Sequence, residues 1–146
     1  MSIQNQSKRS EKGQSMVELA LGIVILLILL AGIIDLGRLL FFYISLRDAA
    51  QEGAVYGQIH NESSQTAYCA AINSRISEYL NNPAGLAITV TMDNQACASA
   101  SAANTCSGKE IKVSVKSPFS FAMPLFGGST INLMTEITGT ILRPPC

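Results

Sequence analysis

Residues 13–34 read GQSMVELALGIVILLILLAGII, and this stretch decides how the whole chain is organised. Residues 1–13 form a leader that we expect to be disordered, and its charged side chains are Lys8, Arg9, Glu11 and Lys12. From Leu19 to Ile34 the chain then has no charged and no strongly polar side chain. An ordinary secretory signal is cut after its apolar region. Here the small residue Gly13 precedes that region, so a cut after it would remove the leader and keep the apolar segment as the new N-terminus.

A glutamate, Glu18, stands at the fifth position after Gly13. This order of charged leader, glycine, glutamate and apolar run resembles the processing region of type IV prepilins, and it predicts a cut between Gly13 and Gln14. Ser15 is suited to be a helix N-cap, with Glu18 as its capping-box partner three residues on. An alternative therefore stays open, in which Glu18 is only a capping residue near the membrane surface.

The apolar run is long enough to cross a bilayer once its neighbours are counted. Residues 19–34 fall slightly short of the ~20 that a spanning helix needs. Residues 16–17 and 36–42 are also largely apolar, so we place the span at about 16–38. By the positive-inside rule the basic leader puts the N-terminus in the cytoplasm and everything after about Asp35 outside. The prediction is a single-pass protein of the cytoplasmic (inner) membrane.

Beyond the span the pattern becomes amphipathic and continues to about Tyr56, so one helix should cover residues 14–56. Its polar face and its apolar face each hold residues at helical spacing: Asp35, Arg38, Ser45, Asp48 and Glu52 on the first, and Leu36, Leu39, Leu40, Tyr43 and Ala50 on the second. Asp35 and Arg38 are three positions apart, which favours a surface ion pair.

Small residues recur every four positions at Ala49, Gly53 and Gly57. Such a spacing lets another element approach the helix closely. Packing on the protein's own sheet is the simpler interpretation, and contact with another subunit is the alternative.

Residues 57–146 should form a small extracytoplasmic domain. Residues 66–82 carry the apolar stripe of a second helix, which Pro83 ends. Alternation of apolar and polar residues predicts three strands, at 86–92, 110–116 and 131–141. The expected fold class is α+β, with a long N-terminal transmembrane and amphipathic helix, a second helix and an antiparallel sheet of about three or more strands. The helices should cover the apolar face of the sheet.

The segment Pro118–Gly128, PFSFAMPLFGG, is apolar, aromatic and punctuated by prolines, so it suits neither a strand nor a helix. The simpler interpretation is a loop folded over the open end of the core. The alternative is a patch that meets the membrane or a neighbouring subunit.

Four cysteines follow the span: Cys69, Cys97, Cys106 and Cys146. Their even number and extracytoplasmic position favour disulfides, although four cysteines allow three connectivities. Cys97 and Cys106 flank a short loop of small residues, at 93–108, between two predicted strands. We therefore predict a Cys97–Cys106 bridge, which leaves Cys69 to pair with Cys146.

Composition argues against several classes of function. The chain has zero net charge and no basic patch, so we expect no nucleic-acid partner. His60 is the only histidine, it stands in a polar loop, and no cysteines have metal-ligand spacing, so we expect no metal and no cofactor. We find no catalytic triad, carboxylate dyad or phosphate loop, and predict no catalytic residue, no small-molecule substrate and no enzymatic activity.

Two blocks of the long helix carry a family resemblance. The first is Asp35, Gly37 and Arg38, and the second consists of Ala49, Ala50, Glu52, Gly53 and Ala54. Together with the Gly13 to Glu18 region, they resemble the TadE-like family of minor pilins, or pseudopilins, of the Tad (Flp) type IVc pilus system. Gln51 stands where that family usually has an arginine. The end of the chain is also similar, with a Pro-Phe pair, a Pro-Leu pair, a glycine pair and a threonine-rich last strand.

The resemblance implies cleavage by a prepilin peptidase, assembly with other pilins and pseudopilins, and support of an adherence pilus. Incorporation of the chain in the extracellular pilus is left open as a further location. It also implies that Glu18 contacts the amine of Gln14 on an adjoining subunit. Two alternatives remain: an abundant filament subunit, and an anchored adhesin or ligand-binding domain that uses this export route. The length of the chain counts against the first, because major Flp pilins are usually much shorter.

Overall fold

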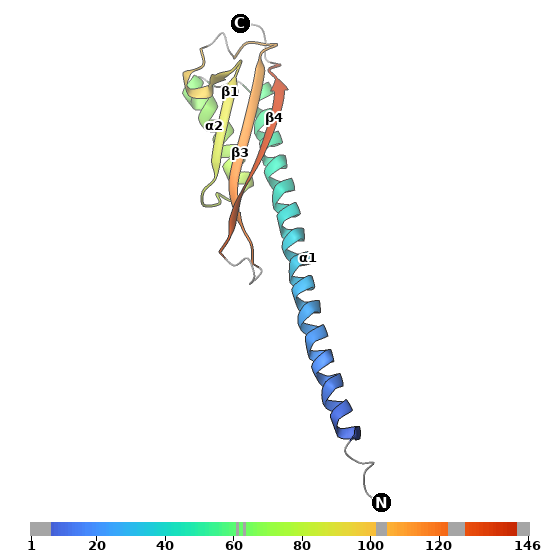
Figure 1. The fold of residues 1–146 in the computed structure, drawn as a ribbon. Helices are drawn as coiled ribbons and strands as arrows, with labels where there is room; N and C mark the ends of the chain where they lie inside the picture. The colour runs from blue at the N-terminus through green and yellow to red at the C-terminus, as the bar shows by residue number, and fades with distance from the viewer. Residues whose placement is uncertain (1–6, 61, 63, 102–104, 123–127, 143–146) are drawn as a thin grey trace, which may run out of the picture.

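One long helix and a small sheet domain make up the chain (Figure 1). The structure is a computed structural model that describes residues 7–60, 62, 64–101, 105–122 and 128–142, with side chains from residue 13 onward. The helix α1 covers Ser7–Ile59, which is 53 residues. At 1.5 Å per residue it is roughly 80 Å long.

Helix α1 begins earlier and ends later than the sequence predicts. It starts at Ser7, inside the predicted leader, and it continues three residues past Tyr56. The prediction that Ser15 caps the helix is therefore wrong in this uncut chain. Lys, Arg and Glu are good helix formers and no proline interrupts the leader, so nothing in residues 7–13 stops the helix.

The two halves of α1 have different surroundings. Every described side chain from Gly13 to Leu30 is exposed, and the most apolar window of the helix has no buried share at all. This half extends away from the domain (Figure 1). The C-terminal half packs against the sheet and the second helix. An apolar helix without protein cover indicates that α1 anchors the chain in a membrane.

The sheet has four strands in the order β2-β1-β3-β4, with every neighbouring pair antiparallel. The strands are β1 (Ala87–Met92), β2 (Gln95–Ala96), β3 (Glu110–Ser120) and β4 (Thr130–Thr140). A short 3-10 helix, η1 (Cys97–Ser99), follows β2. With α1 and α2 this confirms the predicted α+β class.

The second helix, α2 (Gln65–Tyr79), begins where the side chain of Ser64 accepts a hydrogen bond from the N–H of Ala67 at 3.2 Å. It packs beside the C-terminal half of α1. The core between the helices and the sheet is built from fully buried side chains of four elements, including Leu46, Ala49 and Ala50 of α1, Ile72 and Ile76 of α2, Met92 of β1, and Ile111, Val113 and Val115 of β3.

The strands predicted from alternation are present, but two details differ. Strand β3 continues through Pro118 and Phe119 to Ser120, so the prediction that this segment suits no strand is wrong for its first residues. Proline is tolerated there because the last rung between β3 and β1 is Lys116 with Ala87, so no rung to β1 needs the missing N–H. The region predicted as a loop after β1 contains β2 and η1, which are too short to leave a periodic signal.

The predicted disulfide pairing is wrong. Cys69 of α2 is bonded to Cys97 of η1, and their Cα atoms are 5.9 Å apart. The turn into β2 folds η1 back onto α2, which buries Cys97 against Cys69 and away from its predicted partner Cys106. Cys106 is also in a disulfide, and Cys146 lies outside the described residues.

Candidate functional site: helix α1 and the contacts of its outer half

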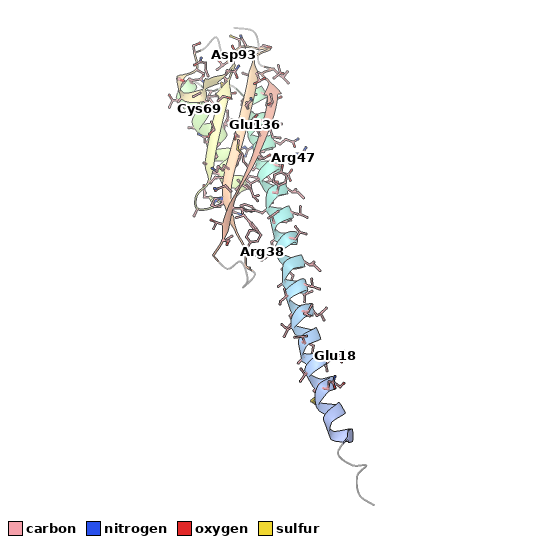
Figure 2. The ribbon with its side chains drawn as sticks, in the orientation of Figure 1. Glu18, Arg38, Arg47, Cys69, Asp93 and Glu136 are labelled. Atoms are coloured by element: carbon pink, nitrogen blue, oxygen red, sulfur yellow. A yellow bond between two sulfur atoms is a disulfide. The ribbon has the colours of Figure 1, made fainter. Side chains whose placement is uncertain are left out.

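The predicted processing residues lie on the exposed half of α1, far from the domain. Gly13, Gln14 and Glu18 are all exposed, and Figure 2 shows Glu18 on the part of the helix that extends away from the sheet. A shallow groove runs along this flank of the helix, lined by Ser15, Glu18, Leu19, Gly22, Ile23 and Leu26. Gly22 lies one turn after Glu18 and has no side chain, so it leaves room beside the carboxylate.

The first residue of α1 that is buried is Asp35, which is 4% exposed. Its carboxylate accepts a hydrogen bond from the Arg38 guanidinium at 2.9 Å. It also accepts the backbone N–H of Ala122, with 3.0 and 3.2 Å from the nitrogen to the two oxygens. The Asp35–Arg38 pair exists as predicted, but it is not a surface pair. The Asp35 carboxylate connects α1 to Ala122, two residues after the end of β3.

Aromatic side chains surround this connection. Phe119, at the end of β3, is 6% exposed and lies 5.8 Å from the ring of Phe42 on α1. The Arg38 guanidinium lies over the ring of Phe119, 5.6 Å from its centroid. Phe121 meets Phe119 edge-on at 5.5 Å. The beginning of the Pro118–Gly128 segment therefore covers the membrane-proximal end of the core, whereas residues 123–127 lie outside the described residues.

The second family block is buried inside the domain. Ala49, Ala50 and Ala54 are fully buried, so this block serves the protein's own packing. Glu52 lies at the border of this contact, 3.7 Å from the Arg75 guanidinium on α2. Because both side chains are about half exposed, this pair contributes at most ~1 kcal/mol.

The small residues of the block allow α2 to approach α1. A side chain on Gly53 would come within 2.5 Å of Ile76 on α2. One on Gly57 would meet Ile111 of β3, and would come within 3.1 Å of Ile72. The stripe of small residues therefore lies at contacts within one chain.

A cluster of polar and aromatic side chains lies at the C-terminal end of α1. The hydroxyl of Tyr56 donates a hydrogen bond to Glu62 at 2.8 Å, and this bond raises the pKa of Tyr56, with burial and the negative charge of Glu62 adding to it. His60 stacks on the ring of Tyr56 at 4.0 Å. The Arg75 guanidinium lies over the same ring at 5.7 Å. His60 is exposed, and within the described ranges no group of three or more His, Cys, Asp or Glu side chains could hold a metal ion.

The sequence did not identify Ala122 as the partner of Asp35. Its contribution is a backbone N–H, which every residue but proline has, and the two are 87 positions apart. The one available signal was the aspartate itself, because a carboxylate beside a long apolar run needs a hydrogen-bond partner.

Together, the exposed apolar half of α1 and its packed C-terminal half define a membrane-anchored protein with a small α+β domain. Residues 13–55 match the family described as TadE-like protein, which confirms the resemblance over the segment that includes Gly13, Glu18 and both helix blocks. This match associates the chain with Tad pilus systems. No curated protein and no solved structure matches the chain.

Proposed function

We propose that this chain is a membrane-anchored minor pilin, or pseudopilin, that supports the assembly of a Tad-type adherence pilus and has no enzymatic activity of its own. The observation that carries the proposal is the build of the TadE-like segment. Within residues 13–55 one uninterrupted helix changes from apolar and exposed on all sides to packed against a domain. This arrangement suits a subunit whose apolar half of α1 lies in the bilayer and can later pack against neighbouring subunits.

The first part of the proposal is processing by a prepilin peptidase between Gly13 and Gln14 on the cytoplasmic side. The cut would remove the part of α1 with Lys8, Arg9 and Lys12, which resists passage into the bilayer. The bond lies within α1, so a peptidase has to unwind this end of the helix. Glycine favours that step because it is a poor helix former.

The second part of the proposal concerns Glu18. An exposed carboxylate close to the apolar span is costly in lipid, so it favours a partner. The cut creates a free amine at Gln14, and this amine on an adjoining subunit would neutralise Glu18. The groove beside Gly22 gives an approaching chain access to the carboxylate.

N-terminal sequencing of the mature protein tests the processing step. We expect Gln14 as the first residue, a block of processing in Gly13→Leu, and normal processing in the matched variant Gly13→Ala. No neighbouring atom lies within 4 Å of a side chain at this position, so both variants fit the folded chain. A mature protein that starts at any other residue contradicts the assignment.

Fractionation combined with pilus counting tests the role of Glu18. Glu18→Ala should insert into the membrane as well as the unmodified chain, because a polar group leaves an apolar segment. It should assemble poorly, whereas Glu52→Ala, which changes a glutamate on the domain side, should assemble normally. Normal pilus numbers with Glu18→Ala would contradict the proposed contact between Glu18 and the amine of Gln14. Recovery of other pilins with the tagged full chain would separate the pilin proposal from a ligand-binding domain.

A further inference from the structure

The hairpin of β3 and β4 is the part of the domain that reaches farthest toward the exposed half of α1 (Figure 1). Its described end, at Phe121 and Ala122, is fixed to α1 at Asp35 through the Ala122 N–H. The depth of this end relative to a bilayer therefore follows from the depth of Asp35.

The helix geometry places Asp35 at the outer boundary of the hydrocarbon. The apolar stretch begins at Met16, nineteen positions before Asp35. At 1.5 Å per residue the separation is about 28 Å, against a hydrocarbon thickness of about 30 Å. If the core of the bilayer begins only after Glu18, the boundary moves outward to about Arg38 and the hairpin end lies deeper.

We propose that the end of the β3–β4 hairpin is a second membrane contact, in which Phe121 and Ala122 rest in the headgroup region of the outer leaflet. The chain then touches the bilayer twice, once by spanning it and once with its domain. The inference requires α1 to span the membrane and is independent of whether the chain is cut or assembled.

The chemistry of the hairpin end suits a lipid surface. Close to lipid, backbone N–H groups need internal partners because little water is available. Phe121 donates its N–H to the carbonyl oxygen of Ser129 at 3.3 Å, and Ala122 donates its N–H to Asp35. The end of the hairpin can thus meet lipid without leaving these two donors unpaired.

The side chains at the same level also fit the interface. Figure 2 shows Arg38 beside the end of the hairpin. Its side chain is 49% exposed and can reach lipid phosphates. Phe41, one turn further, is 74% exposed and Tyr43 is also exposed. Aromatic and cationic side chains are the ones enriched at membrane boundaries. A second contact at this level would fix the tilt of α1 and the orientation of the domain above the membrane.

The chain has no tryptophan, so single-tryptophan variants report on one site each. The full chain is reconstituted in phosphatidylcholine–phosphatidylglycerol nanodiscs that contain lipids brominated near the headgroup. We expect Phe121→Trp and Ala122→Trp to lose fluorescence several-fold more than the control Leu142→Trp. Leu142 is 66% exposed just past the far end of β4. Ala122→Trp should fold even if Phe121→Trp does not, because the Ala122 side chain is exposed and the hydrogen bond to Asp35 uses only its backbone.

Leu29→Trp, within the predicted span, is the reference for a residue in lipid. In a second set of nanodiscs, with lipids brominated deep in the acyl chains, Leu29→Trp should be the most strongly quenched variant. Quenching of Phe121→Trp and Ala122→Trp that does not exceed that of Leu142→Trp, while Leu29→Trp is quenched, overturns the hairpin contact and leaves the proposed pilin function intact. Absence of quenching for Leu29→Trp overturns the span itself and the hairpin contact with it.

Discussion

The carboxylate of Asp35 and the backbone N–H of Ala122 join the start of the packed half of α1 to the end of β3, across 87 positions of sequence. The Arg38 guanidinium holds the same carboxylate from the next turn of α1. A buried aspartate thus accepts hydrogen bonds from a charged donor and from a neutral one, and it connects the anchor with the domain. Loss of this connection should therefore destabilise the contact between the anchor and the domain.

Asp35→Asn tests the strength of the connection. The amide has nearly the same shape but no charge, and it offers Arg38 and Ala122 one accepting oxygen in place of two. Hydrogen bonds to charged groups contribute about 1.5–3 kcal/mol, so we expect a loss of that size in the free energy of unfolding. Thermal unfolding of the full chain in detergent, followed by circular dichroism, measures it. Asp48→Asn, an exposed aspartate on the same helix, is the matched control and should unfold like the unmodified chain.

Phe119→Ala tests whether the start of the Pro118–Gly128 segment closes the core. Phe119 is nearly buried and contacts Phe42, Phe121 and Arg38. Removing a buried ring costs about 3–5 kcal/mol, so the melting temperature should fall clearly.

Phe41→Ala removes a ring that is 74% exposed on α1 and should leave the melting temperature nearly unchanged. Equal and small shifts for Phe119→Ala and Phe41→Ala would show instead that the segment serves as a docking patch. Phe126, a second phenylalanine of the Pro118–Gly128 segment, lies outside the described residues.

The features of the fold that could be predicted are those with a local cause. The apolar run at 19–34 and the amphipathic pattern after it predict one long helix because side-chain periodicity is a property of neighbouring residues. Alternation likewise predicts β1, β3 and β4. The start of α1 was missed because a capping box at Ser15 suits a helix start but does not prevent a helix from beginning earlier.

The features that could not be predicted depend on contacts between distant segments. Cys97 is close in sequence to Cys106 but is bonded to Cys69, because the fold of η1 onto α2 decides which sulfurs meet. In the same way, the spacing of Asp35 and Arg38 predicts their ion pair, but not the contact of Asp35 with Ala122, which lies 87 positions away. The strand position of Phe119 was hidden by Pro118, whose tolerance depends on where β1 ends.

Peptide mapping without reduction tests the disulfides. We expect a linked peptide that contains Cys69 and Cys97, and a second that joins Cys106 to Cys146, the one remaining cysteine of the sequence. A peptide that joins Cys97 to Cys106 would contradict the structure.

Replacing both Cys69 and Cys97 by serine tests the effect of that bridge on stability. The bridge spans 28 positions. On the loop-entropy model such a bridge stabilises the fold by about 3–4 kcal/mol, so the melting temperature of the double variant should fall clearly. Unfolding of the unmodified chain with and without reductant provides the control, and an unchanged melting temperature in both experiments would contradict the prediction.

Gly57→Ala and Gly37→Ala form a matched pair that tests why the outer half of α1 is rich in small residues. Both replace a glycine within the same helix, where alanine is the better helix former by roughly 0.5–1 kcal/mol. At Gly37 no neighbouring atom lies within 4 Å of the new methyl group, so Gly37→Ala should stabilise the chain by about that amount.

At Gly57 the methyl group would collide with Ile111 and come within 3.1 Å of the Tyr68 hydroxyl, which donates a hydrogen bond to the Gly57 carbonyl oxygen. Overpacking of this kind costs about 1–3 kcal/mol, which exceeds the gain in helix propensity, so Gly57→Ala should lower the melting temperature. If both variants were stabilised equally, the close approach of α1, α2 and β3 at Gly57 would not exist in solution.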